Sequence, residues 1–427
     1  MRRLARWTYS AFFGLLVPFI LLRLAWRARR QRGYLRHVGE RFGAYPPAPE
    51  RPVIWIHAVS VGETRAAEPL VKALQKRYPE RVILFTHMTP TGRETSEQLF
   101  GDSVLRCYVP YDLPSAVRAF LDHYRPTFGL ILETEVWFNL VAACRRRRIP
   151  LYLVNARLSE RSARGYGFFA ALSRPAFGAF TAVGAQTKAD AKRLRALGAA
   201  HVVVTGNLKF DVTPPAAAKQ LGDTLRMRFG RERPVLLLAS TRDGEEAMLL
   251  DACDSIDLPD LLIVLVPRHP QRFEEVAMLL EKRGVRYERR SHDEPVPPLA
   301  RVVLGDSMGE MFGYHHAADV AVIGGSFLPY GGQNLIEACA VGTPVIIGPS
   351  TYNFADAVRR AVEARAAVQV PDLESLAGEA ARLLKDPTTR RGMGRDGIAF
   401  ARAHRGATEK TLALLDFSAA TAADRPR

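Results

Sequence analysis

The sequence lacks the short motifs that identify several large enzyme classes. No G-x-x-x-x-G-K-[ST], H-E-x-x-H or G-x-S-x-G occurs in its 427 residues, and the G-x-G-x-x-G at 392–397 lies inside a helical pattern rather than after a strand. Each of these motifs supplies the glycines, the metal ligands or the nucleophile of one particular chemistry. These observations argue against a Rossmann dinucleotide fingerprint, a P-loop, a zinc protease and an α/β-hydrolase.

Cysteine is scarce, and the few cysteines are scattered along the chain without a C-x-x-C pair. Such spacing gives no sign of a disulfide framework or a cysteine zinc site, and it fits a reducing compartment. The four cysteines are Cys107, Cys144, Cys253 and Cys339.

Acidic residues are missing from the N-terminal region, where none precedes Glu40. The apolar run at residues 8–22 is shorter than the roughly 20 residues that usually span a bilayer, and arginines flank it on both sides. Arginines also stand where a signal peptide would need small residues for cleavage. We therefore predict an uncleaved membrane anchor over residues 1–33, which either spans the bilayer or lies in its interface on anionic lipid. The alternative is a buried hairpin helix, but such helices rarely carry arginines at both ends.

The composition indicates a globular protein with two or three domains, because 48% of the residues are hydrophobic and the chain has 427 residues. The formal net charge of +16 is compatible with nucleic acid, an anionic membrane surface or a phosphorylated substrate. No zinc-finger or RNP-type aromatic pattern accompanies the charge, so nucleic acid is the weaker choice.

Apolar strand-like runs alternate with helical patterns after a proline-rich joint at residues 46–52, which predicts parallel, doubly wound α/β sheets. A proline pair followed by small residues at 214–219 is typical of a linker. We therefore predict one Rossmann-like domain at 34–213 and a second at 214–427, with the last helix, 390–403, able to cross back to the first domain. Other predicted elements are strands at 53–59, 128–132 and 320–323 and helices at 64–77 and 114–124.

Residues 324–349 read as strand end, glycine-rich loop, helix and strand. Glycines there let a ligand approach the backbone, and the helix start offers unpaired N–H groups to a phosphate. The alternative is an ordinary crossover in which Asn334 and Glu337 form a variant of the capping box. Two glycine pairs before a helix that carries Glu337 also resemble the nucleotide-sugar site of GT-B glycosyltransferases.

Two glutamates follow predicted strands of the first domain, where ligands bind in open parallel sheets. Glu63 ends the stretch VSVGE, and Glu133 begins ETEVW. For a lone glutamate such as Glu63, a first-turn residue that complements the helix dipole is the usual alternative. The arginines at 157, 161 and 164, with aromatic residues nearby, suit an amphiphilic, anionic acceptor, although an ordinary surface helix would show the same pattern.

Seven motifs in order give the chain a close resemblance to the bacterial Kdo (3-deoxy-D-manno-octulosonic acid) transferases, lipid A-modifying enzymes of the GT-B fold. The motifs are VSVGE at 59–63, ETEVW at 133–137, NARLSERS at 155–162, GNLKFD at 206–211, PRHP at 267–270, DSMGEM at 306–311 and the 324–349 block. The resemblance covers nearly the whole chain, including the N-terminal anchor.

The resemblance implies transfer of Kdo from CMP-Kdo to the glucosamine disaccharide of a lipid A precursor (lipid IVA), with inversion, on the cytoplasmic face of the inner membrane. It assigns Glu63 as general base and carries over Glu133 and Lys209 as site residues, with Lys209 stabilising the departing CMP. CMP would be held by Pro267, Arg268, Met308, Gly309, Glu310, Asn334, Leu335, Ile336 and Glu337. Neither a metal nor another cofactor is implied, and the chain lacks the D-x-D of metal-dependent GT-A transferases.

The sequence departs from the family pattern at three places: Gln333 stands where a His is expected, Phe138 where a Pro is expected, and NLIE where NPLE is expected. These changes leave Asn334 and Glu337 in place and affect the positioning of the donor. Two other functions fit the same features. One is a GT-B transferase that uses a UDP-sugar on another membrane lipid, and the other is a non-catalytic lipid-binding membrane protein. The number of Kdo residues transferred does not follow from the motifs.

Overall fold

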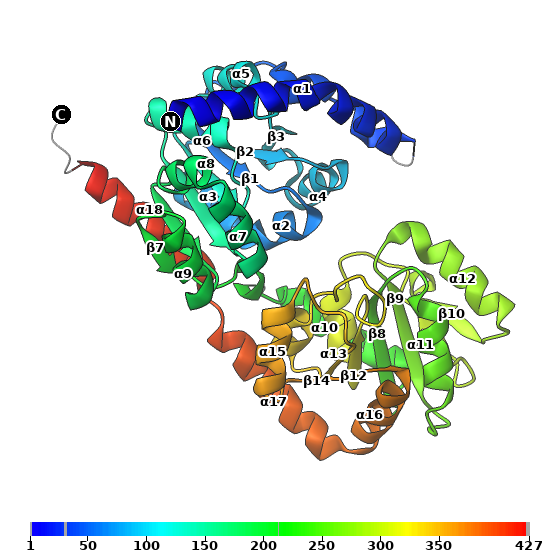
Figure 1. The fold of residues 1–427 in the computed structure, drawn as a ribbon. Helices are drawn as coiled ribbons and strands as arrows, with labels where there is room; N and C mark the ends of the chain where they lie inside the picture. The colour runs from blue at the N-terminus through cyan, green and yellow to red at the C-terminus, as the bar shows by residue number, and fades with distance from the viewer. Residues whose placement is uncertain (1, 30–31, 212, 424–427) are drawn as a thin grey trace. The chain divides into compact units, whose positions relative to one another are not determined.

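The structure is a computed structural model that describes residues 2–29, 32–211 and 213–423. The chain divides into two compact units, of which unit 1 comprises Met1–Asp211 and Arg405–Arg427 and unit 2 comprises Val212–His404. Each unit is built around a seven-stranded sheet whose paired strands are all parallel (Figure 1). The predicted doubly wound α/β architecture is therefore confirmed.

The sheet of unit 1 has the strand order β3-β2-β1-β4-β5-β6-β7. Its central strands are apolar and buried on both faces, as expected of a parallel sheet between two helix layers. Leu105 in one edge strand and Val203 and Val204 in the other are exposed. The strands are β1 Val53–His57, β2 Val82–His87, β3 Leu105–Tyr108, β4 Phe128–Leu132, β5 Leu151–Ala156, β6 Ala182–Ala185 and β7 Val202–Val204.

The helices of unit 1 connect successive strands, except for α1 at the N-terminus and α18, which follows unit 2 in the sequence. They are α1 Arg2–Ala28, α2 Val61–Ala66, α3 Glu68–Arg77, α4 Pro90–Phe100, α5 Pro114–Tyr124, α6 Phe138–Arg146, α7 Glu160–Phe168, α8 Ala170–Phe177, α9 Lys188–Ala196 and α18 Ala407–Ala423.

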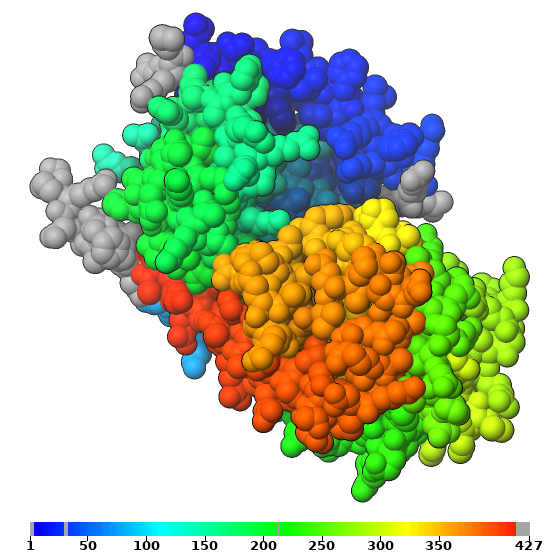
Figure 2. Space-filling model, turned by 60° about the horizontal axis from the view of Figure 1, so that its bottom comes forward, coloured from blue at the N-terminus to red at the C-terminus, as the bar shows by residue number. Residues whose placement is uncertain are grey.

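Helix α18 joins unit 1 through its first turn. The carboxylate of Asp211 accepts the backbone N–H of Gly406 at 2.7 Å and also that of Thr408. Leu414 and Leu415 then pack with the core of the unit, and Figure 2 shows the red start of α18 against green residues of unit 1. The helix that returns to the first domain is thus α18, beyond the predicted last helix.

The sheet of unit 2 has the order β10-β11-β9-β8-β12-β13-β14. The strands are β8 Val235–Thr241, β9 Leu262–Pro267, β10 Tyr287–Arg289, β11 Val302–Leu304, β12 Val320–Ile323, β13 Val345–Ile347 and β14 Ala367–Gln369. The helices are α10 Ala216–Phe229, α11 Glu245–Asp254, α12 Phe273–Lys282, α13 Met311–Ala317, α14 Ile336–Val341, α15 Ala355–Glu363, α16 Leu373–Lys385 and α17 Pro387–Ala403.

Two sequence predictions about helices are wrong. The expected linker at 214–219 largely belongs to α10, because Pro215 forms the N-cap and the alanines that follow are strong helix formers. The single helix expected at 64–77 is divided into α2 and α3. Pro69 lies in the first turn of α3, the position at which a missing N–H is tolerated, so the chain begins a new helix there.

Helix α1 packs along unit 1 by one face. The ring of Tyr9 meets that of Phe138 edge-on at 5.1 Å, and the Asn139 amide donates to the Ser10 hydroxyl at 2.9 Å. Near the other end of the helix Leu24 is buried. These contacts lie far apart along the helix, so α1 lies alongside the globular unit rather than projecting from it (Figure 1).

Candidate active site

The candidate catalytic residues of unit 1 lie at the carboxyl edge of its sheet. The strand order reverses between the paired neighbours β1 and β4. Glu63 lies in the helix that follows β1, and Glu133 follows β4 directly. Ligands of open α/β sheets bind in the crevice at such a reversal, so both glutamates occupy a position expected of site residues.

The carboxylate of Glu63 is held at the start of α2 by two hydrogen bonds. The N–H of Val59 donates to Oε2 and the hydroxyl of Ser60 donates to Oε1, each at 2.8 Å. Ser60 in turn caps the helix by accepting the N–H of Glu63 at 3.4 Å. This capping box shows that Glu63 does have the first-turn role weighed as the alternative. A carboxylate has about four lone-pair sites, so the two bonds orient the group without filling it.

Burial changes the acidity of Glu63. Loss of solvation, followed by the nearby charge of Glu133, raises the pKa of Glu63 from 4.5 to about 7. The hydrogen bonds from Val59 and Ser60 act in the opposite direction, and Glu135 adds a smaller increase. A carboxyl group with a pKa near neutrality is suited to accept a proton at physiological pH.

Two further carboxylates share this edge of the sheet. Glu133 has a left-handed backbone conformation with φ 55°, and its N–H donates to the carbonyl of Val154 at 3.0 Å. Burial, and then the charge of Glu133, raises the pKa of Glu135. Sequence analysis did not assign Glu135 to the site, although the E-T-E motif contained it.

Lys209 supplies positive charge to these carboxylates. Burial lowers the pKa of Lys209, the charges of Glu133 and Glu63 raise it, and that of Arg157 lowers it. The backbone around Lys209 is fixed by two side-chain acceptors, because Asn155 accepts the N–H of Leu208 and Asn207 accepts the N–H of Lys209, each at 3.0 Å. The structure thus brings Glu63, Glu133 and Lys209 into one electrostatic group.

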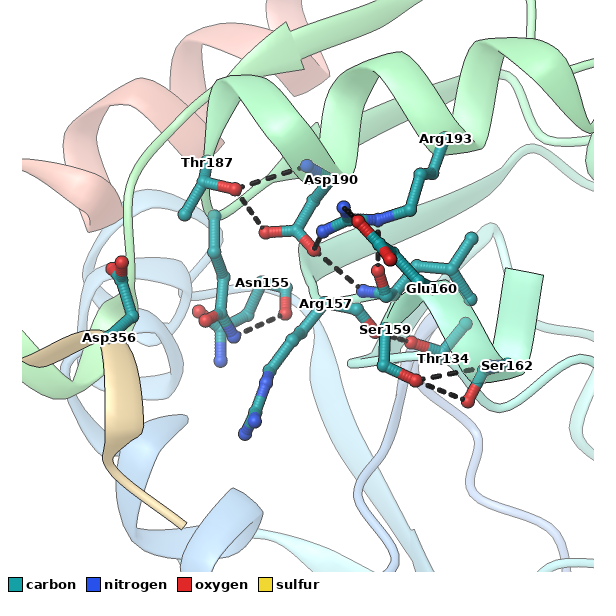
Figure 3. Close-up of polar contacts among 12 residues, drawn as sticks. Thr134, Asn155, Arg157, Ser159, Glu160, Ser162, Thr187, Asp190, Arg193 and Asp356 are labelled. Carbon is teal, nitrogen blue, oxygen red and sulfur yellow. Dashed lines mark hydrogen bonds and ion pairs between the residues drawn. The ribbon is translucent and has the colours of Figure 1, made fainter. Parts of the chain in front are cut away.

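The loop after β5 places Arg157 beside this group. Asp190 accepts the N–H of Leu158 at 2.9 Å, and Arg193 donates to the carbonyl of Leu158 at 2.5 Å and to Asp190 at 3.2 Å (Figure 3). Thr134 donates to the carbonyl of Arg157. In Figure 3 the Arg157 side chain points away from the Asp190–Arg193 pair. The loop backbone is therefore anchored on one side, while the guanidinium extends from the other.

The other residues considered for acceptor contact lie on the exposed surface. Arg161 and Arg164 are exposed on α7, a helix without a buried residue. Phe168 and Phe169 are also exposed and meet edge-on with ring centroids 5.2 Å apart. This combination of cations and aromatic rings stays a candidate surface for an amphiphilic acceptor.

In unit 2 the predicted CMP residues lie at the ends of three strands, of which β11 and β9 are neighbours and β12 is separated from β9 by β8. Pro267 ends β9, and the N–H of Arg268 donates to the carbonyl of Thr241 at 3.0 Å. Met308, Gly309 and Glu310 follow β11, which pairs with β9. The segment with Asn334 follows β12, which pairs with β8 beside β9. Because the strands are parallel, all these segments meet at the carboxyl edge of the sheet.

The stretch after β11 forms a fixed turn. Gly309 has φ 82°, a conformation that favours glycine. Glu310 accepts the hydroxyl of Ser307 at 2.6 Å and Arg290 at 3.0 Å, while the Met308 side chain is half exposed. An exposed apolar side chain next to a fixed backbone turn can cover one face of a base.

The stretch before α14 is held by its own side chains. Asn334 accepts the N–H of Ile336 at 3.1 Å and donates to Glu337 at 2.9 Å. The side chains of Leu335 and Ile336 are fully buried. Contact between these two residues and a ligand is therefore limited to their backbone.

The backbone N–H groups of the two glycine pairs are all bonded within the protein. The N–H of Gly324 donates to Ala239, that of Gly325 to Glu245, that of Gly331 to Ser350 and that of Gly332 to Gly325. A Cβ on Gly324 would lie 2.5 Å from the Ser240 carbonyl oxygen. Glycine is thus needed for close loop packing, and a negative group must be bound by other donors.

Among the residues that the structure describes, no group of three or more His, Cys, Asp or Glu side chains has the arrangement of a metal site. The prediction that the reaction needs no metal or cofactor stays a prediction.

Two family models match the chain. One describes 3-deoxy-D-manno-octulosonic-acid transferase (kdotransferase) and covers residues 36–212; the other describes glycosyl transferases group 1 and covers residues 281–400.

Two curated relatives match over almost their full length. The 3-deoxy-D-manno-octulosonic acid transferase of Bordetella pertussis is 45% identical over 97% of this chain and 99% of its own. The 3-deoxy-D-manno-octulosonic acid transferase of Haemophilus influenzae is 36% identical over 96% of this chain and 98% of its own length. The UDP-GlcNAc 2-epimerase from Neisseria meningitidis, a solved structure bound to UDP-GlcNAc, has a TM-score of 0.57, is 16% identical and covers 85% of this chain and 99% of its own. At that identity the likeness shows a common fold alone.

Proposed function

The chain belongs to the 3-deoxy-D-manno-octulosonic acid transferase family of GT-B glycosyltransferases, and from this premise we propose that it transfers Kdo from CMP-Kdo to the glucosamine disaccharide of a lipid A precursor, lipid IVA. The observation that carries the proposal is Glu63, a buried carboxyl group with a pKa of about 7 at the strand reversal beside Glu133 and Lys209.

The proposed reaction is a single displacement with inversion. Glu63 accepts the proton of the acceptor hydroxyl while the oxygen forms a bond to the anomeric carbon of Kdo. The bond from that carbon to the phosphate oxygen breaks, and its electron pair leaves with CMP. A base with a pKa near 7 is half ionised at neutral pH and binds the proton effectively once it is transferred.

The charged groups around Glu63 have complementary roles in this proposal. Lys209 stabilises the negative charge that develops on the departing CMP and the sugar carboxylate. Glu133 favours the positive charge of an oxocarbenium-like sugar and also keeps the pKa of Glu63 high. The Glu133 carboxylate therefore both stabilises the transition state and keeps the pKa of the base near neutrality.

We assign CMP binding to the carboxyl edge of the unit 2 sheet. Pro267 and Arg268 follow β9, and a fixed turn follows β11. The segment before α14 contributes backbone groups and the Asn334–Glu337 pair, in which the acid is assigned to the ribose hydroxyls. The complete assigned set is Pro267, Arg268, Met308, Gly309, Glu310, Asn334, Leu335, Ile336 and Glu337.

We also propose that the enzyme lies on the cytoplasmic face of the inner membrane, with α1 in the plane of the interface. Leu4–Ala28 is long and apolar enough to cross a membrane, a property that signal sequences and buried core helices share. The placement of α1 is therefore argued from its contacts. One face of α1 packs on unit 1, whereas its exposed side chains are largely apolar. They include Leu4, Trp7, Phe12, Leu15, Phe19, Leu22 and Trp26.

In-plane binding also uses the charge of the helix ends. Arg6 lies near the start of α1, and Arg23, Arg27 and Arg29 lie near its end. Basic residues beside an inserted apolar face are attracted to anionic lipid headgroups. A lipid acceptor in the same leaflet would then be within reach of the anchored enzyme.

The test is incubation of the purified full chain with a tetraacylated lipid A precursor and CMP-Kdo generated in situ, read by lipid mass. We expect a mass increase of one or more Kdo units with the wild-type protein and with Glu97→Gln, which changes an exposed glutamate of α4. With Glu63→Gln we expect a decrease in rate of at least about 100-fold. A folded protein that binds CMP and gives no product would contradict the lipid acceptor.

A further inference from the structure

Arg242 lies at the strand reversal of unit 2, outside the set of residues assigned to CMP. It follows β8 directly, and β8 pairs with β12 at the point where the strand order changes direction. The two loops after these strands meet closely, since a Cβ on Gly325 would lie 3.3 Å from Cγ of Arg242. Such reversals are ligand sites in open α/β sheets.

Glu245 fixes the backbone beneath Arg242. Its carboxylate is fully buried and accepts the N–H groups of Arg242 at 2.9 Å, Gly325 at 2.5 Å and Phe327 at 3.2 Å. The buried charge is thereby satisfied by three donors from the two loops. The same bonds occupy the N–H groups that a glycine loop would otherwise offer to an anion.

The guanidinium of Arg242 is held by two uncharged groups. Nη1 donates to Nε2 of His269 at 2.9 Å, and the guanidinium carbon lies 4.7 Å from the centre of the Tyr330 ring. Within the described part of the chain, no carboxylate lies within ion-pair distance of Arg242. By contrast, neighbouring Arg272 contacts Glu246 at 2.5 Å.

His269 can accept this hydrogen bond because its ring is neutral. Burial, followed by the charges of Arg242, Arg268 and Arg272, lowers the pKa of His269 to about 4. A guanidinium has five N–H donors, and the bond to His269 uses one of them. Arg242 is therefore an oriented cation with donors to spare at a ligand-binding edge.

We propose that Arg242 binds an anionic group of the donor next to the bond that breaks, either the phosphate of CMP or the carboxylate of the sugar. This inference deepens the proposed function and rests on it. Both groups carry acidic oxygens, and the planar fork of a guanidinium can bind two of them at once. Arg242 supplies the anion contact that the glycine N–H groups, already bonded within the protein, do not supply.

The experiment compares Arg242→Gln and Arg242→Lys with the wild-type full chain. The matched control is Arg382→Gln, which removes an exposed arginine of α16 that pairs with Glu379 three residues away. Calorimetry measures the binding of CMP and of cytidine, and steady-state assays measure kcat/KM for CMP-Kdo. Circular dichroism checks that each variant is folded.

We expect Arg242→Gln to lower kcat/KM for CMP-Kdo by about 10- to 100-fold, which is the range for losing charge-assisted hydrogen bonds. Arg242→Lys should recover part of this loss, because a lysine keeps the charge but not the fork. If CMP affinity falls in parallel while cytidine binding is unchanged, the anion is the phosphate. If CMP affinity stays at the wild-type value, the anion is the sugar carboxylate.

A folded Arg242→Gln variant that matches Arg382→Gln in both CMP affinity and kcat/KM would overturn the inference and leave the proposed function intact. It would mean that Arg242 only packs on Tyr330. A wild-type protein that neither binds CMP nor transfers Kdo would instead overturn the proposed function together with this inference.

Discussion

The side-chain oxygen of Asn155 accepts the backbone N–H of Leu208 at 3.0 Å, across 53 residues of sequence. Asn155 is the penultimate residue of β5 and has a left-handed conformation with φ 52°, and its own carbonyl accepts the side-chain N–H of Gln186 at 2.9 Å. Lys209 follows Leu208 directly. The position of the lysine in the candidate site therefore depends on an asparagine of another motif.

Replacing Asn155 by alanine should displace Lys209. The change removes the acceptor of a buried N–H, which costs about 1–3 kcal/mol. Alanine also tolerates the left-handed conformation less well than asparagine does, which adds up to ~1 kcal/mol. We expect lower stability in urea unfolding and a decrease in kcat. The control is Asn155→Gly, which permits the same φ but also lacks the acceptor. It should recover only the free energy of unfolding that alanine loses through the left-handed backbone conformation. Equal kcat in all three proteins would contradict this account.

The pH dependence of the transfer reaction should report Glu63. Its pKa of about 7 predicts that kcat/KM rises with pH through about 7, because the base must be ionised. Glu133→Gln removes a charge that raises the pKa of Glu63, so the rising limb of the kcat/KM profile should move to lower pH. The maximal kcat/KM should also change. The measurement is a pH–rate profile from pH 5 to 9. A limb that stays in place in the variant would contradict the proposed coupling of the two carboxylates.

Glu63→Gln should also change stability in a pH-dependent way. Because the folded-state pKa of about 7 lies above the ordinary 4.5, the group favours the folded state when it is protonated, and this contribution is lost as pH rises from about 4.5 through about 7. At pH 8 the buried ionised carboxylate disfavours folding by up to ~3 kcal/mol.

Glutamine stays neutral, so Glu63→Gln should be more stable than the wild type at pH 8 by about 1–3 kcal/mol and similar to it at pH 5. Urea unfolding at the two pH values measures the difference. A variant that is inactive and less stable at pH 8 would show that the capping bonds outweigh the burial of charge.

The sequence predicted helices and strands correctly where the apolar pattern and the glycines or prolines at its ends agreed. The predicted strands at 128–132 and 320–323 and the helix at 114–124 coincide with β4, β12 and α5. The start of α10 was missed because Pro215 and the small residues after it are compatible with both a linker and a helix N-terminus. Packing on the rest of unit 2 decides between them, and local sequence does not contain that information.

The site was only partly predictable for a similar reason. Glu63 was placed by its position after a strand, and no feature of the sequence pattern indicated that Glu135 would be half-buried near Glu133. The bond from Gly325 to Glu245 joins residues 80 positions apart, so the glycine pattern did not reveal that these N–H groups are bonded within the protein. Contacts of this kind arise when parallel strands bring distant loops to one edge of a sheet.

The orientation of α1 on a membrane gives a last prediction. Phe12 and Leu22 are both exposed on α1 and are separated by ten residues, a rise of about 15 Å along a helix. If α1 lies in the interface, probes at the two positions should have the same depth in the bilayer. If α1 spans the bilayer, the two positions lie on either side of the middle of Leu4–Ala28, so both probes should lie within about 9 Å of the bilayer centre.

The measurement is quenching of a fluorophore by lipids labelled at known depths, in vesicles that contain anionic lipid. Phe12→Cys and Leu22→Cys are labelled separately, and the four native cysteines are buried, so they should react little in the folded protein. The unlabelled wild type tests background labelling. Equal shallow depths would support in-plane binding, in which Tyr9 and Ser10 keep their contacts with Phe138 and Asn139. Depths close to the bilayer centre at both positions would require α1 to leave unit 1 and lose those contacts.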